Sequence, residues 1–166
     1  MKPVTSSSNI TIDASAATAW RVLADEFVDV AAWVPSVRSS GPNPATPDGI
    51  NGSRYGGRVA DVEGLGRIDV RITAYDAEKL TLRYTVEAEN IPAFIHKITN
   101  TWTVTAVGAD SCSIEAMVGV TVIESMSPDA QVTMAVEKML AAGTGASSHL
   151  KTYVESDECH GKAHDA

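Results

Sequence analysis

The stretch RIDVRITAYDAEKLTLRYTVEAE, residues 67–89, decides the fold. Apolar and polar residues alternate over residues 67–75 and again over residues 80–89, with the short segment DAEK at 76–79 between them. Alternation of this kind predicts strands with one buried face, and the short turn makes them an antiparallel hairpin. The predicted buried face consists of Ile68, Val70, Ile72, Ala74, Leu80, Leu82, Tyr84 and Val86.

Further strands are predicted on both sides of this hairpin. They cover residues 8–12, 37–40, 53–59, 94–107 and 111–124, and two short helices lie between the first two, ending before Pro35. From Val132 to Val154 apolar residues recur at helical spacing, which predicts a long C-terminal helix. A sheet with one apolar face needs a cover, and this helix is the only element long enough to supply it. The sequence therefore predicts an α+β fold in which the long helix covers the apolar face of the sheet.

Composition narrows the classes of function. The chain has 166 residues, the size of one domain, and a net charge of −8. No run of Lys or Arg appears, which disfavours nucleic-acid binding and electrostatic attachment to anionic membranes. No apolar stretch is long enough to span a bilayer. The two cysteines are far apart, which favours a reducing, cytoplasmic compartment.

The ends of the chain differ from its middle. Residues 1–7 and 156–166 are expected to be disordered, and residues 8–155 to form one folded domain, which the resemblance described next implies is a ligand-binding domain. Cys159, His160 and His164 in the tail could hold a metal loosely, but a disordered tail explains them better. No metal motif or dinucleotide-binding glycine motif is present, so neither a metal nor another cofactor is expected. The sequence leaves monomer and homodimer open.

Five local strings, in order, carry a resemblance to a known superfamily. They are Ile12–Ser15 leading into Ala19–Leu23, then Trp33–Val37, Gly52–Arg54, Arg71–Asp76 and Leu150–Glu155. Their order and spacing resemble the START-like superfamily, which includes birch-pollen-allergen-like and polyketide cyclase/dehydrase-like proteins. The resemblance implies a helix-grip fold, in which a curved sheet of about seven strands wraps around the long helix and leaves a cavity. It also implies that Trp33 and Pro35 lie at the rim of that cavity.

Candidate site residues come from the inward register of the strand at 94–107. The more apolar register carries His96, Ile98, Asn100, Trp102 and Val104, so these side chains are expected to face the helix. Tyr84 joins them from the preceding strand.

Three of these residues could carry chemistry. His96 is the candidate general acid or base, because an imidazole titrates near neutral pH. Asn100 could hold a ligand carbonyl or stabilise an enolate, and Tyr84 could donate a proton. The alternatives are a solvated His96 at a strand end, a structural Asn100 amide and a Tyr84 that only packs in the core.

Other side chains are candidates for binding alone. Trp33 and Trp102 could form aromatic walls for a flat ligand, and Tyr55 could act similarly. Arg54, with Arg58, could pair with a ligand carboxylate or phosphate. A solvated outer face is the simpler interpretation of both arginines.

Three functions remain open. The leading hypothesis is binding of a small hydrophobic molecule, aromatic or polyketide-like, in an internal cavity. Cyclisation or dehydration of such a molecule without a cofactor, by acid–base chemistry at His96, Asn100 and Tyr84, would add lyase activity. The alternatives are a non-catalytic carrier or sensor and a chaperone-activator-like interaction module.

Overall fold

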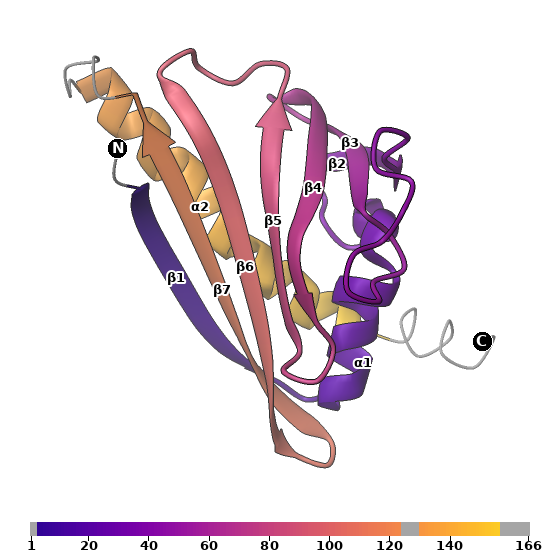
Figure 1. The fold of residues 1–166 in the computed structure, drawn as a ribbon. Helices are drawn as coiled ribbons and strands as arrows, with labels where there is room; N and C mark the ends of the chain where they lie inside the picture. Colours follow the sequence, from indigo (N-terminus) through magenta and orange to yellow (C-terminus); the bar gives the residue numbers. More distant parts are fainter. Residues whose placement is uncertain (1–2, 124–129, 157–166) are drawn as a thin grey trace.

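A computed structural model describes residues 3–123 and 130–156, with the backbone alone at residues 3, 130–132 and 142–144. One antiparallel sheet of seven strands has the order β1-β7-β6-β5-β4-β3-β2, and one long helix, α2, runs diagonally across one of its faces (Figure 1). This arrangement confirms the predicted α+β helix-grip fold.

The helices and strands follow the predicted order. The elements are β1 (Pro3–Ile12), α1 (Ala16–Trp20), a π-helical turn η1 (Arg21–Asp25), a 3-10 helix η2 (Phe27–Ala32), β2 (Val37–Pro42), β3 (Gly57–Val62), β4 (Gly66–Asp76), β5 (Thr81–Ala88), β6 (Ile95–Gly108), β7 (Ser111–Val122) and α2 (Ala130–Val154).

The short helices begin at a side-chain cap. The hydroxyl oxygen of Ser15 accepts a hydrogen bond from the backbone N–H of Thr18 at 3.1 Å, as is common at a helix N-terminus. Residues of α1, η1 and η2 then bury apolar side chains against the same face of the sheet as α2. We call this face, toward α2 and the short helices, the inner face, and the opposite one the outer face.

Two irregularities in strand pairing change which side chains face inward. A bulge lies in β4 between Ile72 and Ala74, and another lies in β6 between Ile95 and Lys97. A bulge adds one residue to a strand and so reverses the alternation beyond it. Ala74 therefore pairs with Arg83 on the outer face, and the prediction that it faces inward is wrong.

Apolar side chains on the inner face form two clusters. The large cluster gathers around Phe27, Trp102 and Leu150, beneath the short helices and the C-terminal end of α2. The small cluster lies toward the N-terminal end of α2 and contains Ile95, Ile98, Val118, Val120, Val136 and Leu140. Both clusters touch Val86, which is partly buried.

The predicted chain ends need one correction. The strand β1 begins at Pro3 and pairs with β7 along its whole length, so residues 3–7 are not a disordered segment. The alternation that predicts strands is weak there, because residues 5–8 are Thr and Ser. Of the predicted tail, residues 157–166 lie outside the described residues, as do residues 1–2. Among the described residues no helix is long and apolar enough to cross a membrane.

Candidate functional site

Tyr84 is the centre of a hydrogen-bonded group on the inner face. Its hydroxyl oxygen accepts a hydrogen bond from the indole N–H of Trp102 at 3.0 Å and a longer one from Nη2 of Arg58 at 3.4 Å. Tyr84 and Trp102 are 5% and 3% exposed. Both contacts use the Tyr84 oxygen as acceptor, so its own O–H remains available to donate to a ligand oxygen.

Arg58 reaches this group from β3. Its side chain is only 8% exposed, and Nη1 donates to the backbone carbonyl of Phe27 at 2.9 Å. Burial lowers the pKa of the Arg58 guanidinium below its ordinary value, while Tyr84 beside it opposes this effect. The interpretation of Arg58 as a solvated outer residue is therefore wrong.

The hairpin register explains the position of Arg58. Val62 pairs with Gly66 across the turn, and counting back along both strands pairs Arg58 with Val70. Since Val70 is fully buried on the inner face, Arg58 must point the same way. The glycines at 64 and 66 mark a tight turn in the sequence, and pairing counted from that turn gives this register. The predicted strand at residues 53–59 begins before β3 does, and the early start hides the register.

Tyr84 and Trp102 each pack against a further aromatic ring. Phe27 and Tyr84 meet edge to face with centroids 5.5 Å apart, and Trp33 and Trp102 do so at 6.3 Å. The Arg58 guanidinium carbon lies 4.2 Å from the centroid of the Phe27 ring. Phe27 was not among the predicted site residues, whereas Trp33 and Trp102 were.

Asn100 lies at the boundary between the two apolar clusters. Along β6 it separates Ile98 of the small cluster from Trp102 of the large one, and it pairs with Tyr84 on one side. Its Oδ1 atom is buried and has no hydrogen-bond partner among the described residues. Buried polar atoms nearly always have such a partner. The side chain is thus placed as predicted, with one acceptor left for another molecule.

His96, predicted to face inward, is exposed. The bulge between Ile95 and Lys97 reverses the alternation at the start of β6, so Ile95 is buried in its place. The prediction that His96 lies with Asn100 and Tyr84 is therefore wrong. The alternation of residue types does not indicate this bulge, which is seen only in the pairing of β6 with β7.

The remaining predicted binding residues are spread over the end of the sheet near the short helices. Trp33 is nearly buried, but Pro35 is exposed in the turn that follows. Tyr55 is half-buried against the large cluster. Arg54 is exposed in the loop before β3, with its guanidinium carbon 5.3 Å from the ring of Tyr55.

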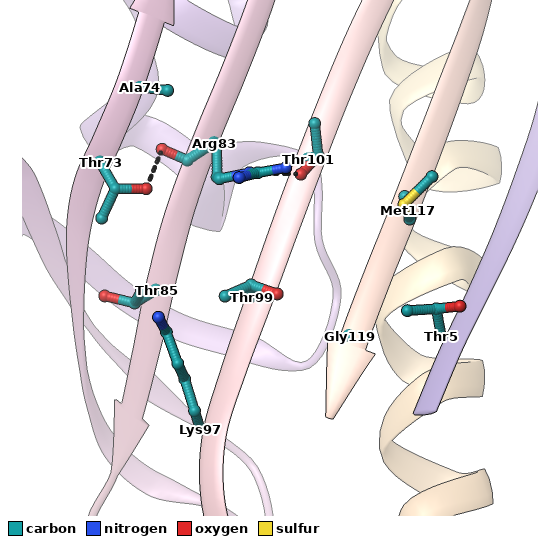
Figure 2. Close-up of a pocket in the computed structure, with 10 residues that line it drawn as sticks. All are labelled: Thr5, Thr73, Ala74, Arg83, Thr85, Lys97, Thr99, Thr101, Met117 and Gly119. Atoms are coloured by element: carbon teal, nitrogen blue, oxygen red, sulfur yellow. Dashed lines mark hydrogen bonds between the residues drawn. The ribbon is translucent and has the colours of Figure 1, made fainter. Parts of the chain in front are cut away.

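The two best-defined hollows among the described residues lie over the outer face and over the β2–β3 edge of the sheet. The larger, about 450 Å³, is on the outer face (Figure 2). Arg83 and Lys97 project into it among threonines, and Arg83 is held by a 3.2 Å hydrogen bond to Thr101. The second, about 390 Å³, lies over β2 and β3 near Asp61 and Arg67. On the inner face the described apolar side chains form the large and the small cluster.

Metal binding has no support in the described part of the chain. No group of three or more His, Cys, Asp or Glu residues is close enough there to hold an ion. The tail residues Cys159, His160 and His164 lie outside the described residues.

The sequence of the chain matches the model of a known protein family. The profile of the family described as Polyketide cyclase / dehydrase and lipid transport matches residues 3–155. No curated protein matches the chain by sequence.

Solved structures show the same fold at low sequence identity. A START superfamily protein from Mycobacterium smegmatis is 18% identical, with a TM-score of 0.65 over 91% of this chain and 97% of that one. The Zhui aromatase/cyclase from a Streptomyces species is 13% identical, with a TM-score of 0.68 over 92% and 91%. Norcoclaurine synthase from Thalictrum flavum, solved with dopamine and hydroxybenzaldehyde, is 18% identical, with a TM-score of 0.63 over 92% and 88%.

Proposed function

The chain belongs to the polyketide cyclase/dehydrase and lipid transport family, and we propose that it binds a small, flat, largely apolar molecule against the inner face of its sheet. The ligand would lie between the two apolar clusters, over Asn100, Tyr84 and Trp102. Fold alone does not define a function in so varied a superfamily, so the proposal depends on these side chains.

The proposal depends mainly on Oδ1 of Asn100, which is buried and has no partner in the part of the chain that the structure describes. Leaving a buried acceptor without a donor costs about 1–3 kcal/mol. A ligand with a hydroxyl or N–H group would supply the donor and recover that free energy. The Tyr84 hydroxyl, which has its proton available, would donate to a second ligand oxygen.

The aromatic rings favour a flat ligand. Phe27 packs edge to face with Tyr84, and Trp33 does so with Trp102, whose indole N–H is bonded to the Tyr84 hydroxyl. Aromatic pairs prefer offset or edge-to-face contacts, each adding about 0.5–1.5 kcal/mol beyond burial. An aromatic ligand is also consistent with the titles of two structural relatives, an aromatase/cyclase and an enzyme solved with dopamine.

The proposal is confined to binding. Acid–base conversion of the ligand was predicted to use His96, and that side chain lies outside the group formed by Asn100 and Tyr84. Neither of these two side chains is a base at neutral pH. The identity of the ligand within the aromatic or polyketide-like class stays a prediction.

Calorimetric titration with 2-naphthol and 2-methoxynaphthalene tests the proposal. Both probes are flat and apolar, but only the naphthol can donate to Asn100. We expect saturable binding of both, with a preference of roughly 3- to 10-fold for the naphthol from one hydrogen bond. At 100 times its Kd the naphthol should stabilise the fold by about 2.7 kcal/mol.

A matched pair of variants completes the test. Asn100→Leu removes the acceptor and should abolish the preference, whereas Asn90→Leu, at an exposed turn, should keep it. Absence of saturable binding of either probe to the wild-type chain would refute the proposed function. A preference that survives in Asn100→Leu would remove Asn100 from the site.

A further inference from the structure

Arg58 is a buried charged side chain that has no counter-charge among the described residues. Its guanidinium remains protonated at any ordinary pH, and such groups are almost never fully buried unless paired. Within residues 3–123 and 130–156 the ion pairs involve other side chains, among them Arg38 with Asp61 and Arg67 with Asp69. In the described part of the chain Arg58 is bonded to, or lies over, only the neutral groups of Phe27 and Tyr84.

Those neutral contacts leave one edge of the guanidinium almost free. Nη1 is bound to the Phe27 carbonyl at 2.9 Å. On the other edge, Nη2 has only the 3.4 Å contact with the Tyr84 hydroxyl, and Nε has no partner among the described residues. The N–H groups of Nε and Nη2 point the same way, in the fork that binds both oxygens of a carboxylate.

Resting on the proposed function, we infer that the ligand of the inner face carries a carboxylate, which pairs with the Nε and Nη2 edge of Arg58. Its apolar body would lie over Trp102 and Asn100, and its charge would be matched inside the protein. The Tyr84 hydroxyl lies beside the same edge and would donate to a carboxylate oxygen. A hydroxyl on the far side of the body would reach Asn100.

Anchoring of the short helices is a second role for Arg58, but it explains only part of the geometry. The bond from Nη1 to Phe27 ties the start of η2 to β3, across 31 positions of sequence. It requires neither a charge nor the unpaired Nε. A neutral donor of similar length would serve, without the unfavourable burial of a cation.

Paired probes test the inference, because one differs from the other only in charge. Naphthalene-2-carboxylate and naphthalene-2-carboxamide are titrated calorimetrically into the full chain at pH 7.5. We expect the acid to bind at least 10-fold more tightly than the amide. Arg58→Met should remove this preference while retaining binding of the amide, and Arg58→Lys should retain part of it.

Two controls test whether cations other than Arg58 cause the preference for the acid. Arg71→Gln, exposed on the outer face, should leave the preference unchanged. The double variant Arg83→Gln, Lys97→Gln removes the cations of the outer hollow and should also leave it unchanged. If this double variant loses the preference, the acid binds on the outer face and the inference fails.

The outcomes separate the inference from the proposed function. Equal affinity of the acid and the amide for the wild-type chain overturns the inference and leaves aromatic binding standing. Binding of neither probe overturns both. If Arg58→Met does not fold, as urea unfolding would show, the wild-type comparison and Arg58→Lys still decide the matter.

Discussion

Replacing Asn100 by Leu should stabilise the protein in the absence of ligand. The substitution keeps the branching at Cγ but removes Oδ1, a buried acceptor with no partner among the described residues. Removing such a group relieves a cost of about 1–3 kcal/mol. The new methyl groups would also contact Ile98 and Val118, which flank position 100 on the inner face. The expected gain in the free energy of unfolding is about 1–3 kcal/mol.

Urea unfolding followed by circular dichroism measures this gain. For a domain of this size each kcal/mol raises Tm by roughly 2–4 °C, so a thermal scan should agree with the urea result. Asn90→Leu, at an exposed turn, should change stability by less than about 0.5 kcal/mol. Asn100→Val is a control for overpacking, because the side chain of Val is smaller than that of Leu.

A loss in the free energy of unfolding of these variants would contradict the prediction. If both Asn100→Leu and Asn100→Val lose more than about 1 kcal/mol, the amide is a satisfied structural group and its Oδ1 is not reserved for a ligand. Asn100→Asp should destabilise in either case, since a buried carboxylate there would face apolar clusters. A gain in stability with a loss of naphthol binding is the pattern expected of a functional residue.

Three further predictions concern other parts of the chain. His96→Ala should change the unfolding free energy by less than about 0.5 kcal/mol and leave naphthol affinity unaltered in calorimetry, because the side chain is exposed; a loss of binding would return it to the site. Burial raises the pKa of the Cys112 thiol and of the Tyr75 hydroxyl, the latter with a contribution from Asp25. Both groups keep their protons to higher pH in the folded chain than in the unfolded chain, so in urea unfolding the free energy of unfolding should fall as the pH rises above about 8.5, where an unfolded thiol begins to ionise; a free energy of unfolding that stays constant from about pH 8 to about pH 11 would contradict this. Gly57→Ala should cost about 1–3 kcal/mol in the same assay, because a Cβ there would lie 2.1 Å from the Val70 carbonyl oxygen.

Alternation was sufficient to predict most of the sheet and part of the site. The hairpin of β4 and β5 follows directly from residues 67–89, and it places Tyr84 inward. The same argument places Asn100 and Trp102 inward on β6, as the structure shows. These positions depend only on the two-residue period of a strand, which can be seen in the sequence as alternating apolar and polar residues.

The errors arise where pairing between strands overrides the pattern within one strand. A bulge at the start of β6 places Ile95 instead of His96 on the inner face, and no residue type in this segment indicates a bulge. Arg58 is buried because β3 pairs with the apolar face of β4, although a charged residue ordinarily predicts an outer position. Such exceptions to residue preference are expected at functional sites, where stability is exchanged for binding.

Binding of a small aromatic molecule to the inner face of the sheet can be followed in a nitrogen–proton NMR spectrum of the ¹⁵N-labelled chain titrated with 2-naphthol. The chain has three tryptophans, and Trp102→Phe identifies the indole signal of Trp102. We expect this signal to shift saturably, together with the backbone signals of Tyr84 and Asn100. Shifts confined to Thr85, Thr99 and Lys97 around the outer hollow, or no saturable shift, would contradict it.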